Sequence, residues 1–196
     1  VFFIYQYQHS SMVEWIVMKQ LYFMRHGESE ANARNICAGH TDVPLTVLGR
    51  KQAARAGHHI KESHIPIDLI ISSPLQRALA TAQEVARIIH YPCDTIIIHN
   101  DAIERFRGNL EGQPSEKQDG LSQEAFAQYG AESEEAMIER STRLLHFIQQ
   151  RPEQSILLVS HNQFGRTFIA HCHGQSWNHV AKLPNAHIIP VTSSHL

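Results

Sequence analysis

The sequence predicts an α/β protein in which helices cover both faces of a mostly parallel β-sheet. Short apolar runs alternate along the chain with longer amphipathic helical patterns, and this alternation is typical of βαβ units. The chain has 196 residues, 42% of them hydrophobic, which is enough for one globular domain with its own core. Helices on both faces of such a sheet make a three-layer α/β/α sandwich.

Five apolar runs are expected to form the strands of this sheet. They are Leu21–Met24, Asp68–Ile71, Thr95–Ile98, Ile156–Val159 and Ile188–Val191. Pro190 lies within the last run and has no backbone N–H to donate. Proline is confined to edge strands for this reason, so the last run is expected at an edge of the sheet.

Helical patterns separate the apolar runs. A single apolar stripe over Leu75–Ile89 predicts a helix that ends before Pro92. Thr46 is a suitable N-cap for a second helix that reaches Ser63. Two more helices are expected, over about Ser133–Gln150 and near Gln123–Tyr129, the latter within a polar surface excursion.

The composition excludes several classes of protein. Seventeen Lys and Arg oppose nineteen Asp and Glu, for a net charge of −2, and no basic run is present. The chain therefore lacks the basic surface of a general nucleic-acid-binding or membrane-surface protein. The three cysteines are odd in number and widely spaced, which argues against a disulfide framework and favours a reducing, cytoplasmic compartment.

Residues 1–17 differ in character from the rest of the chain. The segment is apolar but interrupted by polar residues, so it is too short and too polar to span a bilayer, and it lacks the basic start of a secretory signal. We expect an N-terminal extension over 1–17 and a single domain over 18–196.

Polar residues follow four of the five predicted strands. These residues are Arg25 and His26 after the first strand, Arg77 after the second, Glu104 after the third and His161 after the fourth. In open α/β sheets, ligands bind at the carboxyl ends of the strands. The two arginines, two histidines and one glutamate are therefore expected to converge on one crevice.

This set of side chains suits the chemistry of a phosphoryl group. Two guanidiniums and an imidazole match its three equatorial oxygens, and a second imidazole is placed to attack phosphorus in line. We expect the charges of Arg25 and Arg77 to lower the pKa of His26 and keep it neutral and nucleophilic. Glu104 is then placed to protonate the departing oxygen and later to deprotonate water.

Four ordered blocks of sequence carry a specific resemblance. They are Met24–Ser29 with Asn32, Ser73–Ala78, Glu104–Gly112, and Ser160–His161 with Arg166. In this order the blocks resemble the histidine phosphatase superfamily, also called the phosphoglycerate mutase-like family. The resemblance implies a phosphoglycerate mutase-like fold for residues 18–196 and catalysis without a metal or cofactor.

The resemblance also implies a role for each matching residue. His26 is the phosphate acceptor and Glu104 is the acid and base. Arg25, Arg77 and His161 bind the phosphoryl group, and Asn32 lies close to it. Glu28 and Glu111 remain alternatives to Glu104 as the proton donor.

Two positions depart from the family pattern. Asn162 follows the second histidine, where the family commonly has glycine, and Arg107 precedes Gly108, where the family commonly has an aromatic residue. Together with Glu28, these residues are expected at the substrate rim, where Arg107 is either a specificity group for an anionic substrate or a plain surface charge.

A group of histidines near the C-terminus offers a competing interpretation. His171, Cys172 and His173 are adjacent, with His179 and His187 nearby. Their spacing does not match a tetrahedral or octahedral ligand set, so no metal site is predicted.

The expected function is that of a metal-independent phosphomonoester phosphatase acting through a covalent phosphohistidine. The expected partner is a small phosphorylated metabolite, neither nucleic acid nor membrane, and the oligomeric state is left open. A phosphoglycerate-type mutase and a phosphate- or phosphoprotein-binding module without turnover are the alternatives. Only 57 residues separate Glu104 from His161, whereas the mutases that the chain resembles carry a longer insertion there, so hydrolysis is favoured.

Overall fold

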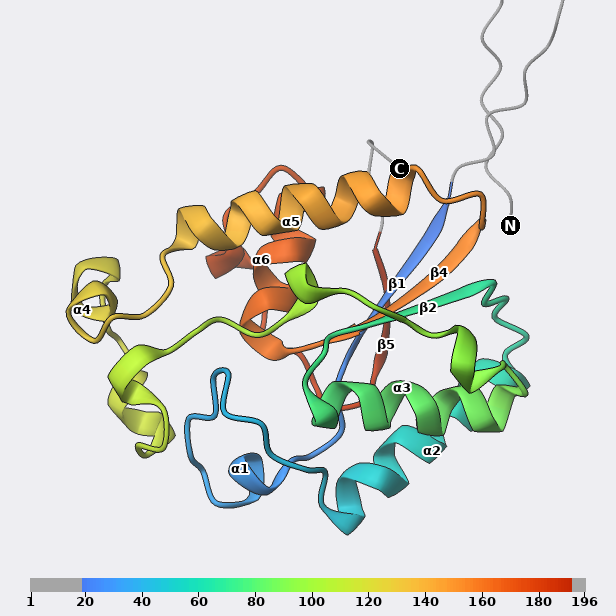
Figure 1. Cartoon of the computed structure of the whole chain (residues 1–196), viewed down its shortest axis with the longest axis horizontal. Coiled ribbons are helices and arrows are strands. Elements are labelled where there is room, and N and C mark those ends of the chain that lie inside the picture. The colour runs from blue at the N-terminus through green and yellow to red at the C-terminus, as the bar shows by residue number, and fades with distance from the viewer. Residues whose placement is uncertain (1–18, 192–196) are drawn as a thin grey trace, which may run out of the picture.

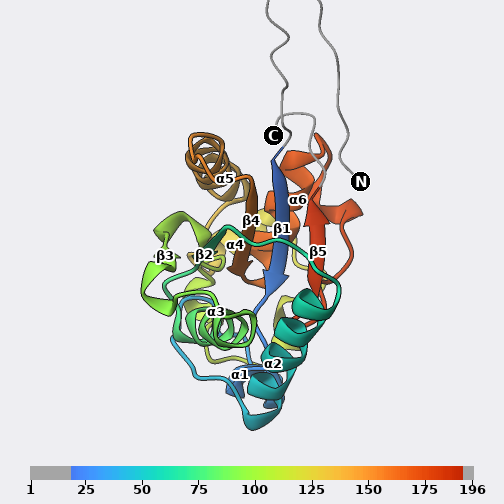
Figure 2. The same cartoon turned by 90° about the vertical axis from the view of Figure 1, so that its right-hand side faces the viewer.

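The computed structural model describes residues 19–191, so the expected extension over residues 1–17 lies outside the described residues. Five strands form one sheet in the order β3-β2-β4-β1-β5, which Figure 2 shows from left to right. The strands are β1 (Gln20–Arg25), β2 (Leu69–Ser72), β3 (Ile97–Ile98), β4 (Ser155–Ser160) and β5 (Ile188–Val191). All five lie within or beside the predicted apolar runs.

The sheet is parallel except at one edge. Strands β1, β4, β2 and β3 pair in parallel, and β5 pairs antiparallel with β1. Pro190 lies in this edge strand, as its missing N–H predicts. Strand β3 is shorter than the predicted run, because Cys93–Thr95 forms a 3₁₀ turn directly after Pro92.

Helices cover both faces of the sheet, which confirms the predicted three-layer α/β/α sandwich. Helices α2 and α3 lie on one side and α5 and α6 on the other, below and above the strands in Figure 1. The α-helices are α1 (Glu30–Ala33), α2 (Val47–Glu62), α3 (Gln76–Ile89), α4 (Gln123–Gln128), α5 (Glu134–Gln149) and α6 (Asn162–Cys172). The 3₁₀ helices are η1 (Cys93–Thr95), η2 (Asn100–Ala102), η3 (Gly108–Leu110), η4 (Ser115–Gln118) and η5 (Trp177–His179).

The alternation of side chains along β1 divides the core into two clusters. Leu21 and Phe23 pack with α5 and α6, whereas Met24 packs with α2 and α3 on the opposite face. Strands β2 and β4 lie in the middle of the sheet and are buried along their whole length. Within the described part of the chain, no helix has the length and hydropathy that a membrane span requires.

Two helices were not predicted from the sequence patterns. Helix α6 has buried residues around most of its circumference, including Phe164, Thr167 and Phe168, so its sequence does not show one clean apolar stripe. Helix α1 is a single turn, and a capping box between Ser29 and Asn32 defines it. The predicted helices over Thr46–Ser63, Leu75–Ile89, Ser133–Gln150 and Gln123–Tyr129 all form, with ends within one residue of the expected positions.

Candidate active site

The carboxyl ends of β1, β2 and β4 meet at one edge of the sheet, beside a cavity of about 900 Å³. The expected site residues that line it are Arg25, His26, Glu28, Asn32, Arg77, Glu104, Arg107 and Asn162. His161 is the exception, because its fully buried ring lies behind His26, with 5.1 Å between the two ring centroids. The polar excursion before α5 also lines the cavity through residues of η4 and α4.

The position and tautomer of His26 follow from its backbone surroundings. His26 directly follows β1, and its main-chain N–H donates to the Ser160 carbonyl at the end of β4. Its ring Nδ1 lies 2.6 Å from the Gly27 carbonyl oxygen. A carbonyl oxygen only accepts hydrogen bonds, so Nδ1 carries the ring proton and Nε2 retains its lone pair.

The pKa of His26 lies well below its ordinary value. Burial is the largest cause, and the charges of Arg77 and Arg25 add to it. The prediction from sequence had the right direction, but it named repulsion by the arginines as the cause. Desolvation contributes more, because the ring is almost completely buried in the wall of the cavity.

His161 lies between β4 and α6 and is neutral for the same reasons. Burial lowers its pKa well below the ordinary value, and the charge of Arg77 lowers it further. Its Nε2 lies 2.7 Å from the Ser73 hydroxyl, which extends from the end of β2. Its Nδ1 is buried and has no hydrogen-bond partner among the residues that the structure describes.

The two arginines expected at the phosphoryl group are buried, which excludes a surface role for Arg77. Arg77 donates from Nη1 to the Thr41 carbonyl and from Nη2 to the Gly39 carbonyl. Arg25 donates from Nη1 to the Leu183 carbonyl, 2.8 Å away. Carbonyl oxygens orient both guanidiniums without cancelling their charge, so the positive potential at the cavity is preserved.

Glu104 is held as a carboxylate by main-chain N–H groups. Its Oε1 accepts from the N–H groups of Arg105 and Phe164, and its Oε2 accepts from that of Gln163 at the start of α6. Burial alone raises the pKa of Glu104, but the charge of Arg107 and these hydrogen bonds outweigh burial. The pKa of the carboxyl therefore lies below its ordinary value in the ligand-free protein.

Arg140 on α5 positions the loop that carries Glu104. Its guanidinium donates to the carbonyls of Ile103 and Glu104, stacks on Phe164 at 4.3 Å and pairs with Glu132 at 2.6 Å. Arg140 does not stand out in the sequence, because the carbonyl oxygens that accept its hydrogen bonds are 36 to 39 residues away along the chain. Ser73 belongs to the second sequence block, and its contact with His161 follows only from the fold.

The remaining candidate residues at the rim accept hydrogen bonds from groups in the loops around them. Asn32 accepts from the Ser29 N–H, Asn162 accepts from the Leu183 N–H, and the Glu28 carboxylate accepts from the Thr46 hydroxyl. The Glu111 carboxylate accepts from the N–H groups of His40 and Thr41, and Glu111 is not part of the cavity lining. Among the three candidate acids, Glu104 is the one that lines the cavity and whose charge acts on both Arg25 and Arg77.

The C-terminal histidines do not gather around a common point. Cys172 is buried in the hydrophobic core, while His171 hydrogen bonds to Thr142 on the surface. Across residues 19–191, no group of three or more His, Cys, Asp or Glu side chains lies close enough together to bind a metal ion.

Comparisons with known proteins give a consistent family. The family model of the histidine phosphatase superfamily (branch 1) matches residues 21–195. An uncharacterised phosphatase, PhoE of Bacillus subtilis, is 31% identical over 148 residues, which are 74% of this chain and 72% of that protein. A 2,3-bisphosphoglycerate-dependent phosphoglycerate mutase of Bartonella bacilliformis is 39% identical over 95 residues, 48% of this chain and 46% of the mutase.

A solved structure shares nearly the whole fold. It is a phosphoserine phosphatase variant of Entamoeba histolytica in complex with phosphoserine, with a TM-score of 0.74 and 26% sequence identity. The likeness covers 91% of this chain and 100% of that one.

Proposed function

The chain belongs to the histidine phosphatase superfamily, and on this premise we propose that it hydrolyses phosphomonoesters of small metabolites through a phosphorylated His26. One observation carries the proposal. A neutral imidazole with a free Nε2 lines the same cavity as two buried guanidiniums, whose charges act on it, and a carboxylate. A module that only binds phosphate needs the guanidiniums but neither the nucleophile nor the proton donor.

In the first step of the proposed reaction, the guanidiniums of Arg25 and Arg77 and the His161 imidazole bind the phosphoryl oxygens. The Nε2 of His26 forms a bond to phosphorus as the ester P–O bond breaks. The electron pair of that bond leaves with the alcohol oxygen, which takes a proton from Glu104.

The proton on Glu104 arrives with the substrate. In the ligand-free protein the carboxylate is ionised, because positive charges and N–H groups surround it. A bound phosphoryl group brings negative charge to Arg77, whose charge helps to lower the pKa of Glu104, and so raises that pKa. Phosphate monoesters have a second pKa of about 6, so part of the substrate enters as the monoanion and supplies the proton.

In the second step, water attacks the phosphohistidine and the N–P bond breaks. The Glu104 carboxylate, left ionised by the first step, accepts the proton of the attacking water. Inorganic phosphate leaves and neutral His26 is restored.

The cover of the site supports hydrolysis over transfer back to the substrate. A mutase must keep water from its phosphoenzyme, which requires a substantial lid. Here the segment between Arg107 and α5 contributes only η4, the loop that follows it and α4 to the cavity lining. We therefore propose that water reaches the phosphohistidine.

The experiment measures phosphate release from p-nitrophenyl phosphate by the wild-type protein, His26→Ala and His58→Ala. His58 is an exposed histidine on α2, so His58→Ala makes the same chemical change away from the cavity. We expect activity in the wild type and in His58→Ala only, with acid-labile phosphate trapped on the wild type after an acid quench. Turnover without a trappable phosphohistidine contradicts the covalent route, and phosphate binding without turnover identifies a binding module.

Two further measurements separate the alternatives. With 3-phosphoglycerate and catalytic 2,3-bisphosphoglycerate, we expect free phosphate rather than 2-phosphoglycerate, and efficient isomerisation with little phosphate released overturns the assignment. EDTA should leave the rate unchanged, because arginines and histidines supply the positive charge that Mg²⁺ supplies at other phosphoryl-transfer sites. Loss of activity in EDTA that added metal restores contradicts the metal-independent route.

A further inference from the structure

Arg107 is a buried cation without a partner of its own. Its side chain lines the cavity and is only 8% exposed, so it is not the plain surface charge that the sequence left open. Its guanidinium makes no hydrogen bond or ion pair with any residue between 19 and 191. The guanidinium carbon lies 5.3 Å from the centroid of the Phe126 ring, and the charge of Arg107 lowers the pKa of Glu104.

The other arginines that are buried at or beside the cavity are already bonded to the protein. Each donates side-chain hydrogen bonds to protein oxygen atoms; they are Arg25, Arg77, Arg105 and Arg140. Those bonds fix the four guanidiniums in place. Arg107 is the one arginine of this group whose guanidinium N–H groups have no acceptor among the described residues.

The carboxylates of Glu104 and Glu111 are hydrogen bonded to main-chain groups rather than paired directly with the Arg107 guanidinium. Glu104 is engaged by three main-chain N–H groups, and Glu111 accepts from the backbone of the loop at residues 40–41 and from the Arg107 N–H. Neither carboxylate forms an ion pair with the Arg107 guanidinium within the described part of the chain. A second cation, Arg105, lies over the same Phe126 ring at 4.2 Å.

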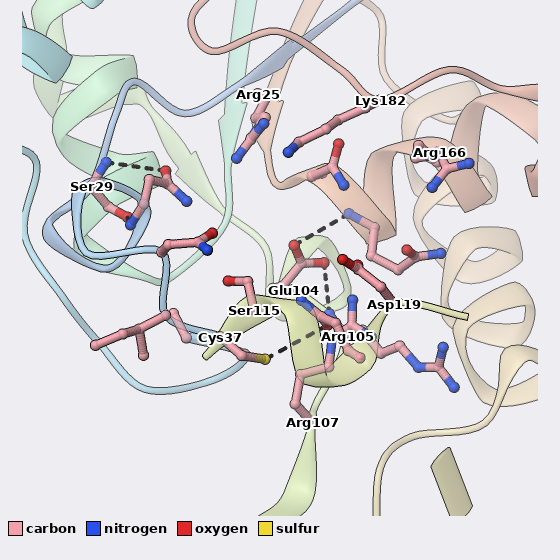
Figure 3. Close-up of a pocket in the computed structure, with 18 of the residues that line it drawn as sticks. Arg25, Ser29, Cys37, Glu104, Arg105, Arg107, Ser115, Asp119, Arg166 and Lys182 are labelled. Carbon is pink, nitrogen blue, oxygen red and sulfur yellow. Dashed lines mark hydrogen bonds between the residues drawn. The ribbon is translucent and has the colours of Figure 1, made fainter. Parts of the chain in front are cut away.

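Arg107 is separated from the phosphoryl-binding residues by Glu104. Figure 3 shows Arg25 and Lys182 at one end of the pocket, Glu104 in the middle and Arg107 at the other end. A ligand anion at Arg107 is therefore distinct from the phosphoryl group that His26 attacks.

We propose that Arg107 binds a second anionic group of the substrate, so that the preferred substrates are phosphomonoesters carrying a carboxylate or a second phosphate. The proposal rests on the proposed function and names the substrate class of that same site. A guanidinium presents parallel N–H donors that fit carboxylate and phosphate oxygens in a bidentate manner. A buried cation without a partner is unfavourable, and an anion that reaches it gains more than it would at an exposed charge.

The test compares substrates that differ only in the second anion. The first pair is 3-phosphoglycerate and glycerol 3-phosphate, in which a hydroxymethyl group replaces the carboxylate. We expect the wild type to prefer the carboxylate by roughly 10- to 100-fold in kcat/KM for phosphate release, the range of a charge-assisted hydrogen-bonded pair. The second pair, propane-1,3-diol bisphosphate and its monophosphate, shows whether a phosphate serves as the second anion.

Variants then assign the preference to one residue. Arg107→Gln should reduce the ratio of the two kcat/KM values to within about threefold of unity, whereas Arg107→Lys should keep part of it. Lys182→Gln removes the same charge from an exposed side chain at the other end of the cavity and should keep the whole preference. Arg107→Met keeps the aliphatic stem beside Phe126 and replaces Arg107→Gln if the latter does not fold.

The outcomes distinguish this proposal from the proposed function. An unchanged ratio in Arg107→Gln, or a ratio lost in Lys182→Gln instead, overturns the assignment of Arg107 while hydrolysis itself stands. No preference in the wild type for either anionic substrate overturns the proposed substrate class. If the wild type hydrolyses no phosphomonoester, the proposed function fails, and calorimetric binding of the same pairs to the wild type and to Arg107→Gln still tests the anion subsite.

Discussion

Mild acid should destabilise this protein strongly, because His26 and His161 are both buried and neutral. In the folded chain their pKa values lie well below the ordinary value, with burial as the largest cause. In the unfolded chain a histidine has a pKa of about 6.5. The unfolded state therefore binds protons that the folded state does not, and the stability that is present above pH 6.5 is lost as the pH falls below it.

The size of this loss follows from the linkage relation. At pH 5.0, protonation of one unfolded imidazole favours unfolding by about 2 kcal/mol, as long as the folded imidazole stays neutral. The two histidines together contribute about 4 kcal/mol, which is a large part of the 5–15 kcal/mol that stabilises a typical domain. For a domain of this size, 1 kcal/mol corresponds to about 2–4 °C, so Tm should fall by roughly 8–16 °C between pH 7.5 and 5.0.

Thermal melts of the wild type, His161→Gln and His58→Gln at constant ionic strength measure this effect. His161→Gln removes one of the two buried titrating groups, so about half of the pH-dependent loss should disappear. His58→Gln changes an exposed histidine and should leave the full loss in place. An equal loss in the wild type and in His161→Gln would refute the reasoning, whatever the absolute Tm of each protein.

Substitutions at the candidate site and in the residues that support it separate proton transfer from folding. Glu104→Gln should lower the rate by about 10²–10⁴ on an alkyl phosphate and by less on p-nitrophenyl phosphate, whose anion leaves unaided; equal losses point to another acid. Arg140→Met leaves Glu132 without its partner and should cost about 3–5 kcal/mol in urea unfolding; a loss near zero contradicts the positioning role. Gly49→Ala places a Cβ 2.0 Å from the Glu28 carbonyl oxygen, so stability and kcat should both fall, and unchanged values of both argue against this close packing.

The fold could be predicted from the sequence where a segment contacts the core through one face. Helix α3 buries a single stripe, and its sequence shows that stripe directly. Helix α6 packs against the sheet, α5 and the loop before β5 at once, so its apolar residues are spread around the helix and the period is lost. Strand β3 is shorter than the sequence predicts, because only Ile97 and Ile98 pair with β2 and the residues directly after Pro92 form a 3₁₀ turn.

The candidate site could be located for a different reason. Parallel strands bring their carboxyl ends to one edge, so residues that follow the strands are neighbours whatever their separation in the chain. The sequence does not contain the contacts that set their chemistry. The position of the ring proton of His26 depends on the Gly27 carbonyl, and the hydrogen bond between His161 and Ser73 spans 88 residues of the chain. The burial of Arg107 depends on Phe126, which a long polar excursion carries back over the cavity.

Unpartnered polar atoms in the described chain collect at this same edge. In the described part of the chain, four buried side-chain nitrogen or oxygen atoms lack a hydrogen-bond partner. Three of them belong to residues in or directly behind the cavity: Arg25 Nε, His161 Nδ1 and Gln163 Nε2. Each buried atom without a hydrogen-bond partner lowers the free energy of unfolding. The buried neutral histidines lower it further as the pH falls, because the unfolded state then binds more protons. A phosphoryl group carries acceptor oxygens and negative charge, which are what these donors and guanidiniums lack in the ligand-free protein. The features that lower stability at this edge of the sheet are therefore the ones that would bind a phosphorylated substrate, so greater stability here would come at the expense of substrate binding.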